Sequence, residues 1–232
     1  MRGAWTVVQF ASSANRACRT SRLLDSNTGN ELLRVTVGER FSSLTPRVTL
    51  GAPTATTNQS DVLLSVAGRM SNTITLDSLA QYNPNESRTE MFAATAQYRP
   101  EAGKVFNLGY RYTFSADPDP SKTLKQADMS TQWLLGGRWH MVGQVKYSLQ
   151  ERRTVEALAG LEYNQDCWAL RLVAQQFATA LNVTSTSYFL QLELYDLIRI
   201  GSGDPLSALK RSVPGYTILS ERPKSSPAQN LP

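Results

Sequence analysis

Apolar and polar residues alternate one by one along much of this chain, and this period of two constrains the fold more than any other feature. In a β-strand successive side chains point to opposite faces, so alternation of this kind predicts strands with one apolar and one polar face. Helical spacing fits none of these segments better. We predict about ten strands of roughly 10 to 12 residues, and they lie near residues 31–41, 60–70, 73–82, 92–99, 106–114, 127–137, 141–150, 154–163, 168–175 and 185–195.

The predicted strands are about twice the usual globular length, and they match the roughly 9 to 11 residues that cross a bilayer at a tilt. The connections also alternate in length. They are tight at Ser71-Asn72, near Gly137-Arg138 and at 164–166, but long at 42–59, 115–126 and 179–184. Short turns on one rim and longer polar loops on the other are typical of outer-membrane barrels, with the short turns in the periplasm. We therefore place residues 116–122 outside the cell.

The pattern predicts an all-β fold: a portion of an antiparallel transmembrane β-barrel of about ten strands, that is, a partial barrel. Aromatic residues stand near strand ends, where interfacial girdles are expected; they are Tyr82, Tyr98, Phe114, Trp139 and Tyr163. Two alternatives remain open. A soluble all-β binding module would produce similar alternation and would bury the aromatics in a core. A porin-like channel would need a closed barrel.

Composition narrows the function classes. The longest apolar runs are only a few residues, so no segment is long enough for a spanning helix. The net charge of +5 is spread along the chain except for a basic tail with Lys210, Arg211, Arg222 and Lys224. No aromatic and basic cluster accompanies that tail, so we do not expect a nucleic-acid partner. Two cysteines, Cys18 and Cys167, are too few for a disulfide scaffold or a cysteine-rich zinc site.

Catalytic and metal-binding constellations are not apparent in the sequence. The single histidine, His140, is expected at a turn, and Asp117 and Asp119 stand in a proline-containing loop where turn chemistry explains them. We therefore predict no enzyme activity, no cofactor and no metal site. The polar faces carry Arg111, Lys146 and Arg171. These cations are candidates for contacts with phosphorylated glycolipid, and the alternative is ordinary charge that keeps a lumen hydrated.

Several stretches do more than alternate. Residues 160–172, GLEYNQDCWALRL, resemble the C-terminal region of the lipopolysaccharide-assembly protein LptD family, in which a Gly-hydrophobic-Glu-Tyr stretch leads into cysteine, an aromatic, alanine and arginine. Other stretches are similar to that family as well. They are residues 187–194, SYFLQLEL, the strand-loop-strand sequence of 78–84 and 87–90, and the C-terminal stretches 200–202 and 209–216. The resemblance runs from about Ser21 to Tyr216.

The resemblance implies a barrel of about 26 strands preceded by a periplasmic jellyroll, so this chain is expected to be a C-terminal fragment without signal peptide, jellyroll or earlier strands. We divide it into an atypical leader of uncertain origin (1–20), the C-terminal part of the barrel (21–199) and a polar C-terminal tail (200–232) that folds back toward the periplasmic rim. The implied function is delivery of lipopolysaccharide (LPS) to the outer leaflet of the cell outer membrane. The implied partners are the plug lipoprotein LptE, the periplasmic bridge protein LptA, LPS and the barrel-assembly machinery.

The resemblance also suggests roles for individual residues. Many family members carry two adjacent cysteines bridged to the N-terminal domain, whereas here Trp168 follows Cys167. We expect Cys167 to be a disulfide candidate whose partner lies outside this chain, or else a thiol buried at a strand start, and we do not expect it to pair with Cys18. The strand at 185–195 would form one side of the lateral seam through which lipid leaves, with its lipid-facing residues being Tyr188, Leu190, Leu192 and Leu194.

Overall fold

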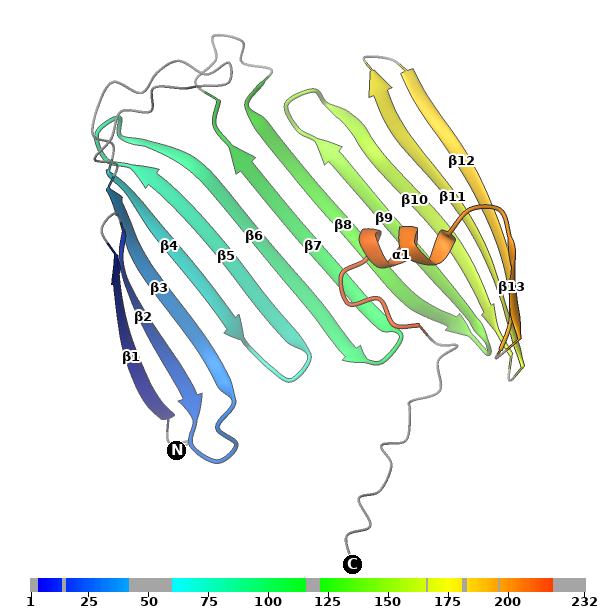
Figure 1. The fold of residues 1–232 in the computed structure, drawn as a ribbon, viewed down its shortest axis with the longest axis horizontal. Helices are drawn as coiled ribbons and strands as arrows, with labels where there is room; N and C mark the ends of the chain where they lie inside the picture. The colour runs from blue at the N-terminus through cyan, green and yellow to red at the C-terminus, as the bar shows by residue number, and fades with distance from the viewer. Residues whose placement is uncertain are drawn as a thin grey trace, which may run out of the picture. The chain divides into compact units, whose positions relative to one another are not determined.

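The computed structural model describes residues 4–13, 16–41, 60–115, 122–165, 167–180, 183–195 and 197–218. Within these ranges it contains one antiparallel sheet of thirteen strands, whose order in space is their order along the chain (Figure 1). The elements are β1 (Ala4–Ser13), β2 (Arg16–Asp25), β3 (Glu31–Phe41), β4 (Ser60–Arg69), β5 (Ile74–Asn83), β6 (Arg88–Glu101), β7 (Lys104–Thr113), β8 (Leu124–Gly136), β9 (Trp139–Ser148), β10 (Arg153–Asn164), β11 (Trp168–Ala180), β12 (Val183–Leu194), β13 (Ile198–Gly201) and the helix α1 (Pro205–Ser212).

The predicted fold class, an all-β antiparallel partial barrel, is confirmed. The structure has more strands than the ten that alternation predicts, because β1 and half of β2 lie in the segment assigned to a leader and β13 crosses the boundary between the barrel part and the tail. Arginines recur at every third position of β2, at 16, 19 and 22, which hides a period of two. The four residues of β13 are too few to show any period.

Residues group into two compact units. The first unit comprises 1–100, 107–129 and 146–155, and β1 to β6 lie in it except for Glu101, the last residue of β6. The pairing register is continuous from strand to strand, apart from one irregularity between β2 and β3 and one between β5 and β6. One face of these strands, hereafter the apolar face, exposes Val37, Leu64, Leu76 and Phe92. A short turn joins β4 to β5, where the Ser71 hydroxyl accepts hydrogen bonds from the N–H groups of Thr73 and Ile74. The tight turn predicted at Ser71-Asn72 is therefore present.

The second unit comprises 101–106, 130–145 and 156–232. Its strands also expose apolar side chains on one face, for example Leu161 and Leu172, and they bury mainly polar ones on the other, hereafter the polar face. A small apolar cluster on the polar face is formed where α1 packs against the strands; its buried members are Val105, Val142, Leu158, Val173, Ala208, Leu209 and Val213. The segment that the sequence predicted to be a polar tail is therefore partly buried, because Ala208, Leu209 and Val213 belong to this cluster.

Exposure of the apolar face contradicts the soluble-module alternative. That alternative places the aromatic residues in a buried core, whereas Tyr188 is 73% exposed and Leu190 is 52% exposed. Within the described residues there is a single sheet, so no second sheet covers this face. The predicted girdle residues Trp139 and Tyr163 do meet, with ring centroids 4.8 Å apart, and Trp168 packs on the other side of Tyr163.

No helix in the described part of the chain combines the length and the apolar character that crossing a bilayer requires. The loops predicted at 42–59 and most of the segment placed outside the cell, 116–121, lie outside the described residues.

Candidate functional site

A row of polar side chains crosses the polar face of β10, β11 and β12. The register pairs Glu162 with Arg171 and Arg171 with Gln191, so alternation directs all three side chains to the same face at the same height. Glu193, two residues beyond Gln191, shares this face. Arg171 is 1% exposed and Glu162 is 2% exposed, so this row lies in the interior of the second unit.

Arg171 is bonded on several sides. Its Nε donates to Glu162 Oε1 at 2.9 Å, and its Nη1 donates to Glu193 Oε2 at 2.5 Å and to Gln191 Oε1 at 3.3 Å. Arg199 on β13 donates from Nε to the other oxygen of Glu193 at 2.7 Å. Two guanidinium groups thus face two carboxylates, and the charges balance, with the exposed Arg199 supplying the second positive charge. A buried charge needs such compensation, because removing one partner leaves the other without solvation.

The C-terminal segment 204–218 is bound to this cluster. Tyr216 donates its hydroxyl hydrogen to Glu162 Oε1 at 2.5 Å. Burial raises the pKa of the Tyr216 phenol well above its ordinary value, and the charge of Glu162 raises it further. The phenol is therefore neutral at physiological pH and acts as a hydrogen-bond donor to the carboxylate.

Helix α1 brings this segment onto the polar face. Asp204 caps the helix by accepting the N–H of Ser207 at 3.2 Å, Pro205 occupies the first turn, and Lys210 and Arg211 stand in the last turn. The hydrogen bond from the Ser207 N–H lowers the pKa of Asp204. Leu209 then points into the apolar cluster at 0% exposure.

A second anchor holds the end of the segment. The side-chain amide of Gln132, on β8, donates to the carbonyl oxygen of Thr217 at 3.0 Å and accepts the N–H of Thr217 at 2.9 Å. Gln132 is 0% exposed, so both its polar atoms depend on this contact. A Cβ at Gly160 would lie 3.3 Å from Val173 Cγ2, which is a tight contact, and 3.6 Å from Leu209 Cδ2, which is an ordinary van der Waals contact.

The strand predicted to form a seam is β12, and its apolar face is exposed as expected of a lipid contact. Tyr188 and Leu190 are exposed, while Leu192 and Leu194 are half-buried. The edge of β12 that faces away from β11 is paired with β13 only from Gln191 to Leu194. Among the described residues, 183–189 therefore have a partner strand on one side alone.

Of the other predicted residues, Arg111, Lys146 and Cys18 belong to the first unit, whereas the Arg171 cluster belongs to the second. Arg111 is exposed on β7 and Lys146 is half-buried on β9. Cys167 is exposed and Cys18 is half-buried, and both are free thiols. Within the described residues, no group of three histidine, cysteine or carboxylate side chains has the arrangement of a metal site.

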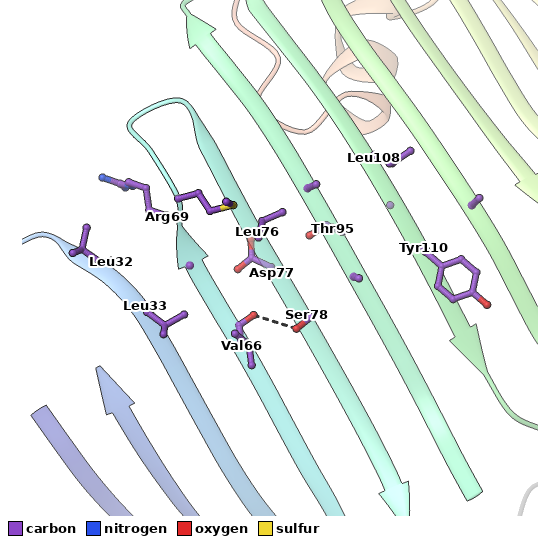
Figure 2. A pocket seen from close by; sticks show the side chains of 16 residues that line it. Leu32, Leu33, Val66, Arg69, Leu76, Asp77, Ser78, Thr95, Leu108 and Tyr110 are labelled. Atoms are coloured by element: carbon purple, nitrogen blue, oxygen red, sulfur yellow. Dashed lines mark hydrogen bonds between the residues drawn. The ribbon is translucent and has the colours of Figure 1, made fainter. Parts of the chain in front are cut away.

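Two adjoining hollows lie in the first unit, at the end of the strands where the short turns are. The larger, of about 650 Å³, lies on the apolar face, and Figure 2 shows Leu76, Ser78 and Leu108 among the residues that line it. Its lining also includes the small residues Gly68, Ala94 and Ala96. The smaller, of about 340 Å³, is lined by polar residues of the turns, and Leu32 and Arg69 belong to both.

Comparison with known proteins places these features in a family. The model of the family described as LPS transport system D matches residues 10–139, which is more than half of the chain. The chain belongs to this LptD family. The resemblance to this family that the sequence indicates is thus confirmed, although residues 160–172 lie beyond the matched range.

Individual LptD relatives extend the similarity beyond the family model. The LPS-assembly protein LptD of Azoarcus sp. (strain BH72) is 45% identical over 201 residues, which cover 86% of this chain and 24% of the relative. That of Nitrosospira multiformis is 42% identical over 197 residues, covering 85% and 20%. That of Ralstonia nicotianae is 35% identical over 207 residues, covering 88% and 25%. The chain thus spans a fifth to a quarter of the length of these curated relatives.

The range that the LptD family model matches includes some of the features described above and leaves out others. The matched range ends at Trp139, the first residue of β9, so the two hollows lie inside it and the Arg171 cluster lies beyond it. Sequence reasoning selected Arg171 but missed three other members of its cluster, Glu193, Arg199 and Tyr216, and the anchor Gln132. A buried glutamate facing an arginine at the same height becomes visible only once the register is known, and Gln132 and Thr217 are far apart in sequence.

Proposed function

We propose that this chain forms part of an outer-membrane barrel that assembles LPS, delivering it to the outer leaflet within the LptD translocon. The observation that carries the proposal, besides family membership, is the polarity of the sheet: exposed side chains such as Leu172 and Leu190 are apolar, while Glu162, Arg171 and Gln132 are buried. This arrangement is the reverse of that in a water-soluble domain and is typical of a barrel whose outside meets lipid and whose inside is polar.

The membrane explains how the apolar face is stable. A contiguous exposed apolar surface in water promotes association, whereas acyl chains solvate it without cost. The short turns face the periplasm in this arrangement, because short periplasmic turns and long external loops are the rule in bacterial barrels. Localisation in the outer membrane follows from this proposal.

The partners that we propose come from the family. They are the plug lipoprotein LptE, the periplasmic bridge protein LptA, LPS itself and the barrel-assembly machinery. The chain needs no catalytic group for this role, since the family is one of transport and assembly proteins. In this proposal the driving force comes from elsewhere in the transport chain.

The seam is proposed at β12. Its open edge from 183 to 189 is supported by the pairing, since only the four residues at its other end meet β13. Tyr188, Leu190, Leu192 and Leu194 would then contact the acyl chains of lipid that leaves the barrel. The short β13 and α1 follow this strand directly, so the C-terminal segment stands beside one end of the proposed seam.

For contacts with LPS phosphate, the exposed guanidinium of Arg111 is the most accessible of the three predicted cations. Lys146 is half-buried. Arg171 is occupied by Glu162 and Glu193, so phosphate would reach it only by displacing a carboxylate. We propose Cys167 as the disulfide residue, with a partner outside this chain, because its exposure makes it accessible. The boundary at residue 20 stays a prediction.

A chimera tests the proposed function. This chain replaces the matching segment in the LPS-assembly protein LptD of Azoarcus, and the chimera is expressed while the resident protein is depleted. Retention of LPS at the cell surface, measured by its accessibility to an externally added modifying enzyme, supports the proposal. Ion conductance in planar bilayers without surface LPS would favour the porin-like alternative instead. Failure of the chimera to reach the outer membrane would contradict both.

A further inference from the structure

The two adjoining hollows of the first unit have complementary chemistry. The larger is lined almost entirely by apolar atoms and opens on the face that exposes Leu33, Leu76 and Leu108. The smaller is lined by Asp25, Asn27, Asn30 and Asn72, which belong to the turns that join β2 to β3 and β4 to β5. An amphiphile with a polar head and an apolar chain matches this pair of surfaces.

Arg69 connects the two hollows. It lies at the end of β4, and Figure 2 shows it at the turn end of the larger hollow, with its nitrogen atoms directed away from Leu76 and Leu108. Its side chain is exposed, and no ion pair involves it in the part of the chain that the structure describes. A guanidinium in this position offers a planar set of donors to a phosphate.

A negative charge lies in the same small hollow. Asp25 ends β2, and its Oδ1 accepts the N–H of Asn27 at 2.9 Å, which leaves Oδ2 for a second donor. One cation and one anion thus line a volume of about 340 Å³ that is also lined by three asparagines. This charge pattern complements a head group that carries both a phosphate and an ammonium.

The apolar hollow is formed by small residues. The small residues are Gly68 on β4, Ser78 on β5, and Ala94 and Ala96 on β6. They lie near one another on the apolar face, because Gly68 pairs with Leu76, Leu76 pairs with Ala96, and Ser78 pairs with Ala94. The volume of about 650 Å³ lies in the range of about 300–1,000 Å³ that small-molecule sites occupy. An acyl chain lying in this depression would contact Leu33 and Leu108 on its sides.

We propose that these two hollows bind one phosphatidylethanolamine molecule, with its phosphate at Arg69, its ammonium at Asp25 and an acyl chain in the apolar hollow. The inference rests on the proposed function, because the apolar hollow meets acyl chains only if this face lies in a membrane. The short turns that carry the polar hollow face the periplasm in that case, so the bound lipid belongs to the periplasmic leaflet. It is a lipid of the surrounding bilayer and is not the lipid that is transported.

Native mass spectrometry tests the site. The full-length protein that contains this chain is extracted from outer membranes in mild detergent and supplied with palmitoyl-oleoyl phosphatidylethanolamine or the corresponding phosphatidylglycerol. We expect one retained phosphatidylethanolamine and roughly 10-fold weaker retention of phosphatidylglycerol, which is the effect of one charge-assisted contact. Equal retention of the two lipids in the unmodified protein would overturn the assignment, as would displacement of phosphatidylethanolamine by an equal concentration of LPS.

Three variants separate the parts of the site. Arg69→Gln lowers phosphatidylethanolamine retention roughly 10-fold. Asp25→Asn removes the preference over phosphatidylglycerol, and Ala96→Leu fills the apolar hollow and abolishes retention of both lipids. The matched controls are Arg152→Gln, an exposed arginine at the opposite end of the strands, and Ala80→Leu, which lies on β5 outside the hollow; both keep wild-type retention. Unchanged retention in Arg69→Gln and Ala96→Leu would overturn the proposal.

Failure of this site is distinguishable from failure of the proposed function. Membrane fractionation and surface LPS are measured on the same variants, with circular dichroism as a check on folding. If the protein resides in the outer membrane and delivers LPS but retains no phosphatidylethanolamine, only the lipid site is wrong. If the protein is absent from the outer membrane, the proposed function and the lipid site are both wrong.

Discussion

Arg171 and Glu162 stand directly opposite each other on β11 and β10, with Arg171 Nε 2.9 Å from Glu162 Oε1 and both side chains almost wholly buried. Glu193 and Arg199 extend this contact to β12 and β13, and Tyr216 joins it from beyond α1. The last strands and the C-terminal segment are therefore connected through one charge-balanced cluster. Its disruption is expected to loosen all of them together.

Replacement of Arg171 by methionine tests this cluster. The variant leaves Glu162 and Glu193 buried with one fewer cation, and the free energy of unfolding should fall by roughly 3–5 kcal/mol. Urea unfolding in lipid vesicles, followed by tryptophan fluorescence, measures the change. Arg111→Met, at an exposed position, should change it by less than about 0.5 kcal/mol. Equal losses in the two variants would show that the cluster has no special role.

Docking of the C-terminal segment should weaken at alkaline pH. The pKa of Tyr216 is raised in the docked state by burial and by Glu162, with Arg171 acting in the opposite sense, while the free phenol ionises near pH 10. Stability from this group is complete below about pH 10 and is lost as the pH rises toward the docked pKa. Hydrogen exchange of residues 204–218 across this pH range measures docking. The Tyr216→Phe variant should lack this dependence, and an unchanged pH profile in it would assign the effect to another group.

Helix α1 should depend on Leu209 for its position. Leu209→Ala removes a wholly buried side chain from the apolar cluster, and docking should lose roughly 2–5 kcal/mol. Limited proteolysis between β13 and residue 218 reports the undocked state. Lys210→Ala, at an exposed site on the same helix, is the matched control. Wild-type protease resistance of Leu209→Ala would mean that Gln132 and Tyr216 hold the segment without the helix.

A charge on the apolar face should be costly only if lipid covers that face. Leu172 is 49% exposed, so Leu172→Arg would be nearly neutral in water. In a bilayer it should cost roughly 2–4 kcal/mol near the midplane. Leu197→Arg, in the short turn after β12, should cost about 0–1 kcal/mol, because it lies at the interface. Similar values for the two variants in vesicle unfolding would contradict burial of Leu172 in lipid.

Alternation was sufficient to predict the strands with two clear faces. The predicted ranges 31–41, 60–70 and 154–163 correspond to β3, β4 and β10 within a residue at each end. It also predicted which side chains would be exposed, such as Tyr188 and Leu190, because the parity of a strand determines the face of each residue. The alternation does not show whether lipid or a second sheet covers the apolar face.

Features that depend on register or on distant contacts could not be predicted. The anchor between Gln132 and Thr217 joins residues that are 85 positions apart, and no local pattern predicts this contact or the strands against which α1 packs. The burial of Arg171 likewise follows from the pairing of three strands, whereas the sequence shows only an arginine on a polar face. Arg171 stays one of three candidates for a phosphate contact, and the sequence alone does not show that Glu162 and Glu193 bind its guanidinium.

The most direct test of the account is the solvent accessibility of alternate residues on β11 and β12 in a lipid bilayer. With Cys18 and Cys167 replaced by serine, single spin labels at Leu172, Leu190 and Lys210 are compared by their collision rates with oxygen and with a water-soluble nickel complex. We expect high oxygen and low nickel accessibility at Leu172 and Leu190, with the reverse at Lys210. High nickel accessibility at Leu172 and Leu190 would place the apolar face in water and contradict the barrel.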